Sequence, residues 1–528
     1  RIEKMESNPN VFRIVPSSTG SKDSQLKRAP LSPGRESKSF FPLIASKATM
    51  SPRQIISNLK VSHLPKIIKN KQVTSRVYRY KILPGNNSRV LLQILKKRPW
   101  WHAILGPDED TSIFTPNFIW EMNRNAKRYK EKFYENVLLN HLQKNDCLIT
   151  KKGLYRCLKS YCLQEGIDLL KIIPRTFYLK SSNKDDDMEE FLNVNQHNLS
   201  SLFSKSNNNN EDVQIPQTPN DVIWILKPAS RTNRGFGIKV VKGMDAVLET
   251  VRKVASRKEN KQESVGINKN RESSSNMKAS FSAAVDKPDV ENEKLASRAK
   301  KMASQDGWIV QLYMERPLLI SGRKFDIRCY VLVTHCARKG LKGYFYDDAY
   351  VRTSSKKYSL SKLADRETHL TNDAVQKNSK TYGKFEEGNK LDFVEWQNSI
   401  NTDYPDAPEG VVLNKIYPEI KRLSKLTVQA AAEVLSISDV QKSFELFGYD
   451  YMVDEQFNPV LIEVNTNPCL EFACPLLTNL ITELIENTIR VAVDTEYPPP
   501  SVGFRTRACE EAIELIESNP LKFAQFYP

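Results

Sequence analysis

The sequence lacks any run of about 18 apolar residues, the length that a helix needs to cross a bilayer, so no membrane span is expected. Its eight cysteines form no CxxC pair and its six histidines are scattered, which argues against a disulfide framework and against a zinc site. The start of the chain has no apolar segment typical of a secretory signal, and the cysteine usage fits a reducing compartment. We therefore expect a cytoplasmic protein.

Acidic residues are fewer than basic ones: the chain has 62 Asp and Glu and 79 Lys and Arg, which gives a net charge of +17. Such an excess predicts an acidic partner: nucleic acid, an anionic membrane or an acidic protein. Residues 1–75 alone hold 14 basic and 4 acidic residues, and residues 257–301 hold 11 and 7. Most of the excess thus lies in segments poor in apolar periodicity. With no recognisable nucleic-acid-binding module, nucleic acid is the weakest of the three partners.

Composition divides the chain into three parts. Residues 1–75, rich in Ser and Pro, are predicted to form a basic disordered arm that could contact an acidic polymer. Residues 76–500 are predicted to form one folded domain with flexible inserts at 181–220 and 257–301, where Asp, Asn and Ser accumulate. Residues 501–528 are interpreted as a short C-terminal tail after three consecutive prolines.

Within the predicted domain, Lys227 ends an apolar strand and precedes a loop that contains Gly235 and Gly237. A loop with glycines lets backbone N–H groups approach phosphates, and a lysine at its edge can neutralise one of them. The spacing matches neither a Walker A motif nor a dinucleotide fingerprint. Taken alone, the segment is better explained as an ordinary hairpin that carries a surface lysine.

A second strand places Lys324, Asp326 and Arg328 on one face, with Phe325 and Ile327 on the other. Charges of alternating sign on one strand face can hold a polyanion and its metal ion, but they also occur on salt-bridged exposed strands.

A third group of polar side chains lies on a predicted hairpin near the end of the domain. If its turn is centred between Gln456 and Phe457, Asp450 faces Glu463, and Asn465 lies on the same face. Apolar neighbours would bury these carboxylates, which is costly for unpaired charges. Oxygen ligands of this kind suit Mg²⁺ shared with nucleotide phosphates, so a metal site is predicted.

Five blocks in this order resemble the tubulin–tyrosine ligase-like family of ATP-grasp ligases: Lys227, Lys324 to Arg328, Tyr350 to Thr353, His369 to Asn372, and Asp450 with Glu463 and Asn465. The segment from Tyr382 to Lys390 is also similar to the tyrosine ligase itself. The resemblance implies an α/β ATP-grasp fold. Its parts would be a small N-terminal lobe, a central lobe and a C-terminal lobe of antiparallel strands and helices, with ATP between the last two.

The resemblance also implies roles for individual residues. Arg328, Arg352 and Glu463 would be catalytic, and Asp450, Glu463 and Asn465 would bind Mg²⁺. The residues implied to contact ATP are Lys152, Lys227, Gln311, Leu312, Tyr313, Met314, Lys324, Asp326, Thr371 and Asn372.

The implied activity is ATP-dependent ligation of a free amino acid to carboxylates of tubulin tails through an acyl phosphate, with glutamylation or tyrosination expected. Alternatives are a glycylase of the same family and a pseudoenzyme that only binds microtubules. The segment Thr466 to Leu470 differs from the small residues of tyrosine ligase and leaves the donor open. The implied partners are tubulin or microtubules and the amino acid, without nucleic acid or membrane. We expect a monomer in the cytoplasm, on the cytoskeleton, with the cilium or basal body as a narrower location.

Overall fold

The computed structural model describes residues 77–86, 88–104, 115–180, 187–202, 217–229, 235–252 and 306–528. The chain divides into two units, 1–72 and 73–528, and all described residues belong to the second. The predictions for the arm at 1–75, for residues 181–186 and 203–216, and for the insert at 257–301 therefore lie outside the described residues.

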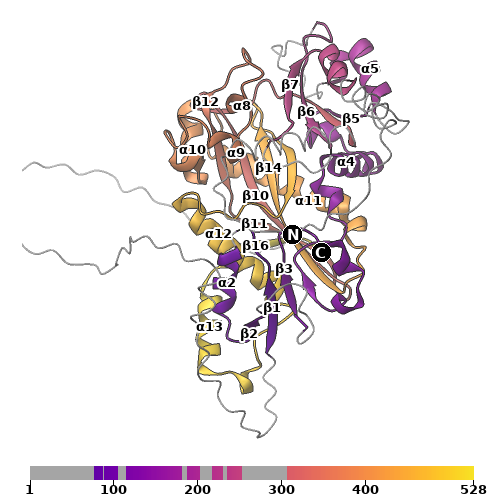
Figure 1. Ribbon diagram of the computed structural model, residues 1–528. Helices are drawn as coiled ribbons and strands as arrows, with labels where there is room; N and C mark the ends of the chain where they lie inside the picture. Colours follow the sequence, from indigo (N-terminus) through magenta and orange to yellow (C-terminus); the bar gives the residue numbers. More distant parts are fainter. Residues whose placement is uncertain are drawn as a thin grey trace, which may run out of the picture. The chain divides into compact units, whose positions relative to one another are not determined.

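One large mixed sheet runs through the second unit (Figure 1). Its longest strand, β10 (Arg323–Cys336), pairs antiparallel with β12 (Tyr350–Lys357) on one side and with β14 (Lys442–Val453) on the other. The remaining strands are β1 (Tyr78–Ile82), β2 (Trp101–Ala103), β3 (Phe118–Trp120), β4 (Leu138–Leu139), β9 (Leu319–Ile320), β11 (Gly340–Tyr346), β13 (Lys390–Leu391), β15 (Pro459–Thr466) and β16 (Phe523–Tyr527).

The N-terminal strands continue this sheet by parallel pairing, in the order β13-β12-β10-β14-β4-β3-β1-β2. Strand β1 near Val77 is followed by helix α2 (Ser88–Lys96). Strand β4 joins β14 through Leu139 opposite Ser443. The mixed α/β class is thus confirmed, while the segment predicted as a small N-terminal lobe shares its sheet with the C-terminal strands.

A second, antiparallel sheet of four strands holds Lys227. It comprises β5 (Thr176–Leu179), β6 (Ile223–Pro228), β7 (Lys239–Lys242) and β8 (Trp308–Leu312) in the order β5-β8-β6-β7. Strands β6 and β8 include the apolar runs in which strands are predicted, and Lys227 lies near the end of β6.

The structure corrects the interpretation of residues 181–220 as one flexible loop. Helix α5 (Met188–His197) and a turn at Leu199–Leu202 lie inside this segment. Phe191 is fully buried, with its ring centroid 5.3 Å from those of Phe177 and Trp224. One aromatic anchor in a polar stretch is enough to dock the helix on β5, and composition alone hides it.

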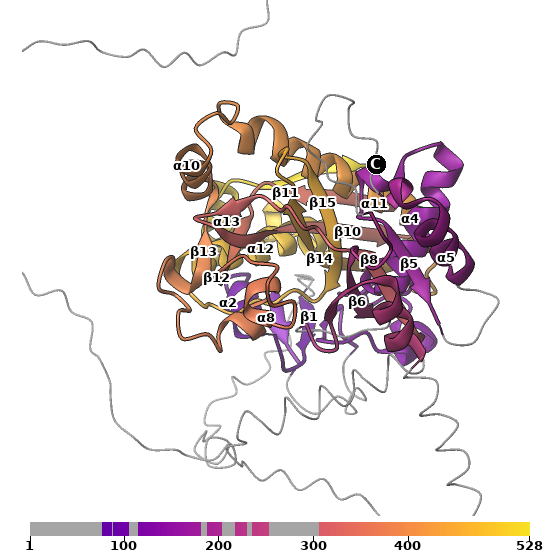
Figure 2. The same cartoon turned by 90° about the horizontal axis from the view of Figure 1, so that it is seen from above.

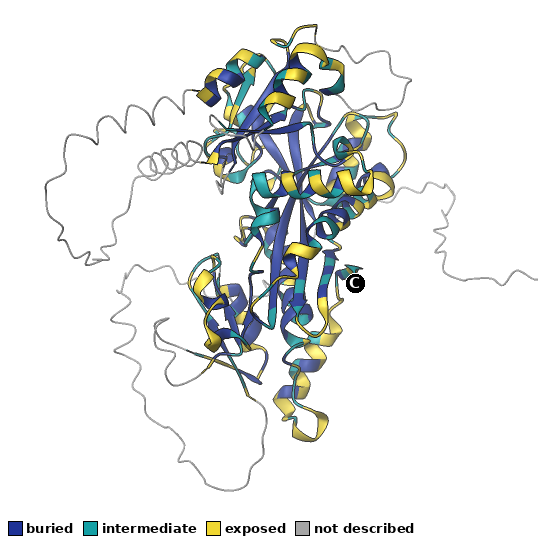
Figure 3. Cartoon of the chain, turned by 90° about the vertical axis from the view of Figure 1, so that its right-hand side faces the viewer, coloured by how far each residue is buried: buried dark blue, intermediate teal, exposed yellow. Residues whose placement is uncertain are grey.

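Helices cover both faces of the large sheet, and the burial pattern in Figure 3 shows buried strands between partly exposed helices. One face of β10 packs against α11 (Tyr417–Leu435), which has Pro418 in its first turn, and the other packs near α2 and α12 (Pro475–Thr488). Figure 2 shows α4 and α5 beside the four-stranded sheet.

The other helices are α3 (Asp146–Ile149), α4 (Lys151–Glu165), α8 (Arg366–His369), α9 (Asp373–Gln376), α10 (Phe393–Asp403) and α13 (Arg507–Ser518), with π-helical turns at η6 (Val412–Ile416) and η7 (Ile489–Asp494). Among the described residues, no helix is long and apolar enough to span a bilayer.

The last 28 residues are part of the fold, which corrects their interpretation as a tail. Strand β16 adds to the edge of the large sheet by antiparallel pairing with β11. Helix α13 buries Cys509 and Ile513 in the same core as α2 and α12. The three prolines end only the preceding helical segment, and the apolar alternation from Phe523 to Tyr527 is long enough to form an edge strand.

Candidate active site

The even-numbered face of β10 changes character along the strand. Lys324, Asp326 and Arg328 are charged and buried, whereas Tyr330 and Leu332 continue the same face as apolar core. On the opposite face, Phe325 and Ile327 pack into the core under α11. The alternation predicted from sequence is therefore confirmed, and the charged face is inside the protein rather than on an exposed strand.

The predicted carboxylate group forms where β14 pairs with β15. Asp450 lies opposite Glu463, as predicted, and the Asn465 Nδ2 atom lies 3.1 Å from Asp450 Oδ2 and 3.3 Å from Glu463 Oε1. The predicted turn centre is off by half a residue, because Val453 pairs with Pro459. A bulge between Asp450 and Tyr451 offsets this difference, so the site residues still face each other.

Arg328 and Arg352 are both bound to carboxylates. Arg328 Nε donates to Asp450 Oδ1 at 2.5 Å, and Arg352 Nε donates to Asp326 Oδ1 at 2.6 Å. Arg352 also reaches Asp450 Oδ2 at 3.0 Å, so Asp450 bridges the two guanidinium groups.

These contacts set the pKa values of the network. Burial disfavours every charge in it, yet the two guanidinium groups hold the pKa of Asp450 well below its usual range, and Asp450 raises the pKa of Arg328. Burial raises the pKa of Asp326 against the opposing effect of Arg352. Asp450 is therefore the carboxylate that stays ionised here.

Two lysines from different sheets meet beside this network. Lys227 Nζ donates to Gln311 Oε1 at 2.8 Å, and Lys324 Nζ donates to Tyr313 Oη at 3.1 Å. Burial lowers the pKa of Lys227 to about 8, and burial together with the nearby Lys227 lowers that of Lys324 to about 7. Desolvated ammonium groups of this kind favour an anionic ligand, because it would restore their charged form.

The segment from Gln311 to Met314, which is implied to contact ATP, spans the end of β8. The backbone N–H groups of Leu312 and Tyr313 already donate to Arg175 O (2.8 Å) and Ile223 O (3.0 Å). The Met314 carbonyl accepts a bond from Tyr358 Oη at 3.4 Å. The implied ATP contact of this segment stays a prediction, and these bonds already engage the Leu312 and Tyr313 N–H groups.

Thr371 and Asn372 lie where α8 passes into α9. The Thr371 hydroxyl donates to Asp326 Oδ2, which ties this connection to the charged face of β10. Asn372 precedes α9, and its carbonyl accepts from Val375 N at 2.8 Å.

Lys151, which the sequence interpretation passed over, lies beside one of the site carboxylates. Lys151 Nζ is 3.8 Å from Glu463 Oε2. Lys152 Nζ lies over the Tyr178 ring, 4.4 Å from its centroid. Adjacent residues on a helix point about 100° apart, so the choice between them depends on how α4 docks, which the sequence does not reveal.

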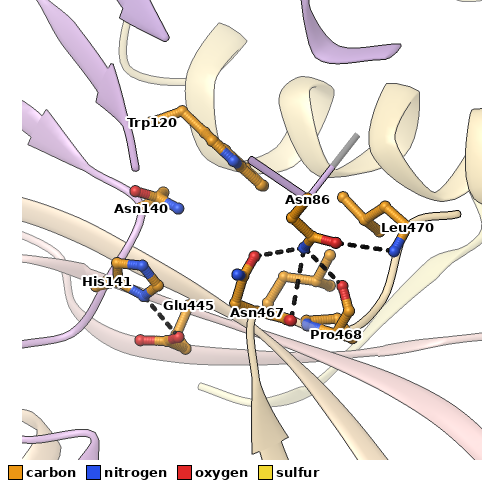
Figure 4. A pocket seen from close by; sticks show the side chains of 9 residues that line it. Asn86, Trp120, Asn140, His141, Glu445, Asn467, Pro468 and Leu470 are labelled. Atoms are coloured by element: carbon orange, nitrogen blue, oxygen red, sulfur yellow. Dashed lines mark hydrogen bonds and ion pairs between the residues drawn. The ribbon is translucent and has the colours of Figure 1, made fainter. Parts of the chain in front are cut away.

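Two further polar residues hold the strand ends at the site, and neither is among the predicted residues. Asn86 Nδ2 donates to Asn467 Oδ1 (2.5 Å) and Pro468 O (2.8 Å), and Asn86 Oδ1 accepts from Leu470 N, as Figure 4 shows. On the other side, the buried Glu445 accepts from Leu142 N, from Asn145 Nδ2 and from Thr466 Oγ1, and lies 2.9 Å from His141 Nδ1. Apart from Thr466, which is 21 residues from Glu445, these partners lie about 300 to 380 residues away in sequence, so no local signal identifies them.

The oxygen donors fit Mg²⁺. The set consists of two carboxylates, Asp450 and Glu463, and the side-chain amide of Asn465, whose nitrogen donates to both. Mg²⁺ typically takes one or two protein carboxylates and shares substrate phosphates. Glu463 is the more accessible carboxylate, with 22% of its side chain exposed, whereas Asp450 is engaged by both guanidinium groups.

Comparison with known proteins supports the family suggested by the motifs. The profile of the tubulin-tyrosine ligase family matches residues 127–500. The chain is 37% identical to tubulin glycylase 3D of Tetrahymena thermophila over 204 residues (38% of this chain, 19% of the relative) and 35% identical to the human protein monoglycylase TTLL8 over 208 residues (38% and 23%). It is 31% identical to the probable tubulin polyglutamylase TTLL9 of Rattus norvegicus over 277 residues (52% and 54%).

The alignments with these three relatives cover between about a fifth and half of each relative's own length. The family match, in contrast, covers well over half of this chain and includes β5 to β8, β10 to β15 and every predicted site residue. The chain therefore belongs to the tubulin-tyrosine ligase family.

Proposed function

We propose that this chain is an ATP-dependent ligase that joins a free amino acid to carboxylates of tubulin C-terminal tails. The observation that carries the proposal is the convergence of Glu463, Asp450 and Asn465 with Arg328 and Arg352 on one sheet face, beside two buried lysines. This arrangement supplies oxygen ligands for a metal ion and cations for phosphate within a single site.

The proposed chemistry has two balanced steps. A carboxylate oxygen of the acceptor attacks the γ-phosphorus of ATP, the bond to the bridging oxygen breaks, and ADP leaves. The amine of the donor then attacks the acyl carbon, inorganic phosphate leaves, and the amine proton passes to solvent or phosphate. Phosphoryl transfer needs positioning and charge neutralisation above all, and no Ser–His–Asp triad is required.

Each side chain has a proposed part in these steps. Lys227 and Lys324 bind phosphate oxygens, with Lys151 a better candidate than Lys152 for a further contact because it faces Glu463. Arg328 and Arg352 hold the acceptor carboxylate and the phosphate charge that develops on it. Glu463 and Asn465, with Asp450 behind them, would hold Mg²⁺, which when bound neutralises phosphate charge.

Glycine and glutamate are the donors that we propose to be tested first. The names of the relatives include glycylases and a probable polyglutamylase. We therefore regard glycylation as being as plausible as the glutamylation expected from sequence, and both as more plausible than tyrosination. A microtubule-binding pseudoenzyme is the remaining alternative. The presence of Lys324, Arg328 and Glu463 favours an active enzyme over it. The proposed setting is the cytoskeleton, with the protein acting as a monomer.

The proposal is tested by incubating the full chain with tubulin, ATP, Mg²⁺ and labelled glutamate, glycine or tyrosine in separate reactions. Incorporation that requires ATP and is confined to one label supports ligation and identifies the donor. No incorporation from any label, with tubulin binding retained, would instead support the pseudoenzyme.

ATP affinity should fall as the pH rises through the range in which Lys324 and Lys227 lose their protons. Both pKa values lie below that of an exposed lysine, at about 7 and about 8, and only the charged ammonium neutralises phosphate. We expect binding roughly 10- to 100-fold weaker at pH 9 than at pH 6.5, with proton uptake on binding near pH 8.

The measurement is titration calorimetry with a non-hydrolysable ATP analogue in buffers of different ionisation enthalpy. Lys324→Met should flatten part of the pH dependence, whereas Lys421→Met, which removes an exposed ion pair with Asp347, should not. A dissociation constant that is independent of pH in the wild type would contradict the proposed phosphate contacts.

A further inference from the structure

A further buried cation, Lys390, continues the charged face of the site. Lys390 on β13 lies directly opposite Arg352 on β12, which in turn lies opposite Asp326 on β10. Side chains at directly paired positions point to the same face of a sheet. The Lys390 ammonium therefore belongs to the same face as Arg352 and Arg328, and none of the roles proposed above uses it.

The partner of Lys390 differs from those of the two arginines. Lys390 Nζ donates to Asp373 Oδ1 at 2.6 Å and to Gly388 O at 2.8 Å, and its side chain is fully buried. Asp373 is 30% exposed, whereas Asp326 and Asp450, which hold the arginines, are 10% and 3% exposed. Of these three carboxylates, Asp373 is thus the one that reaches solvent.

The Lys390 ammonium also retains bonding capacity. It has three N–H donors, and within the described residues the bonds to Asp373 and Gly388 account for two of them. Asp373 directly follows Thr371 and Asn372, and the Thr371 hydroxyl donates to Asp326, the carboxylate that also binds Arg352. The pair therefore borders the space beside the arginines.

We infer that Lys390 binds a carboxylate of the substrate. In the absence of substrate, the Asp373 carboxylate occupies the position that the substrate carboxylate would take. The inference rests on the proposed ligase function and specifies one subsite of it. A carboxylate of the donor amino acid or of the acceptor tail would displace Asp373 from Lys390, as its exposure permits, and would then bond to the ammonium next to Arg352.

The test measures binding rather than turnover, so that it stands apart from the test of ligation. Free glutamate, glycine, tyrosine and a hexaglutamate peptide are titrated into the full chain in the presence of Mg²⁺ and a non-hydrolysable ATP analogue. Lys390→Met should weaken binding of the amino acids or of the peptide by about 30-fold or more, and affinity for the nucleotide analogue should stay within about twofold. Lys390→Arg should recover much of the loss, and Lys421→Met serves as an exposed control.

Asp373→Asn separates recognition from a structural ion pair. If Asp373 competes with substrate, removing its charge should tighten carboxylate binding several-fold, an effect that loss of a structural pair would not produce. A loss confined to the amino acids assigns the subsite to the donor, and a loss confined to the peptide assigns it to the acceptor. Unchanged binding in Lys390→Met, a parallel loss of nucleotide affinity, or wild-type protein that binds none of the four probes would overturn the inference.

Discussion

Replacing Glu463 with glutamine is expected to reduce ligation on the order of 100- to 1,000-fold or more while leaving the fold and tubulin binding largely intact. Glu463 is the accessible carboxylate of the proposed metal site, and glutamine keeps its size but removes the negative charge that a hard cation requires. It accepts one bond from Asn465, which an amide oxygen can also accept, so little structural change is expected.

The measurement is the initial rate of amino-acid incorporation into tubulin, with cosedimentation as the check on binding. Glu455→Gln is the matched control, because Glu455 lies in the turn of the same hairpin, and its contacts with Arg316 (3.2 Å) and Gln456 Nε2 (2.8 Å) are at the surface. Near-normal turnover in Glu463→Gln would show that the metal site has been assigned to the wrong residue.

Local patterns predict the strands of the site well, because each depends on alternation along the strand. The charged alternation from Lys324 to Arg328 fixes which side chains share a face, and burial confirms it. The pairing of Asp450 with Glu463 is also predicted, although it is reached through a shifted turn and a bulge that cancel each other. Counting residues outward from the assumed hairpin turn therefore identifies the correct pair, Asp450 and Glu463, although the position assumed for the turn is wrong.

Features that depend on docking between distant segments are not predictable in this way. The docking of α4 puts Lys151 rather than Lys152 beside Glu463, and Asn86 reaches the loop after β15 from the other end of the unit. Helix α5 and strand β16 are missed because each is held by few apolar residues within polar sequence, and only their packing partners stabilise them. Tertiary contacts, rather than local propensity, decide these elements.

Replacing Asp450 with asparagine is expected to lower the free energy of unfolding by about 3–5 kcal/mol at neutral pH. Asp450 bonds to Arg328 and lies 3.0 Å from Arg352, so its loss leaves two buried guanidinium groups without a shared counter-charge. Because the folded state holds the pKa of Asp450 below its usual value, this stabilisation is fully present above about pH 4 and is lost as the pH falls through the folded-state pKa. The difference between wild type and variant should therefore narrow in acid.

Urea unfolding followed by tryptophan fluorescence measures this difference, and the geometry predicts an order among the variants. Arg328→Met should cost less than Asp450→Asn, because Asp450 would keep Arg352 as a partner, whereas asparagine leaves Arg328 without its carboxylate and Arg352 with Asp326 alone. Asp347→Asn, which breaks an exposed pair with Lys421, should change the free energy of unfolding by no more than about 1 kcal/mol. If Arg328→Met proved the more damaging change, Asp450 would not be the centre of the network, and the two arginines would have to be regarded as independently held groups.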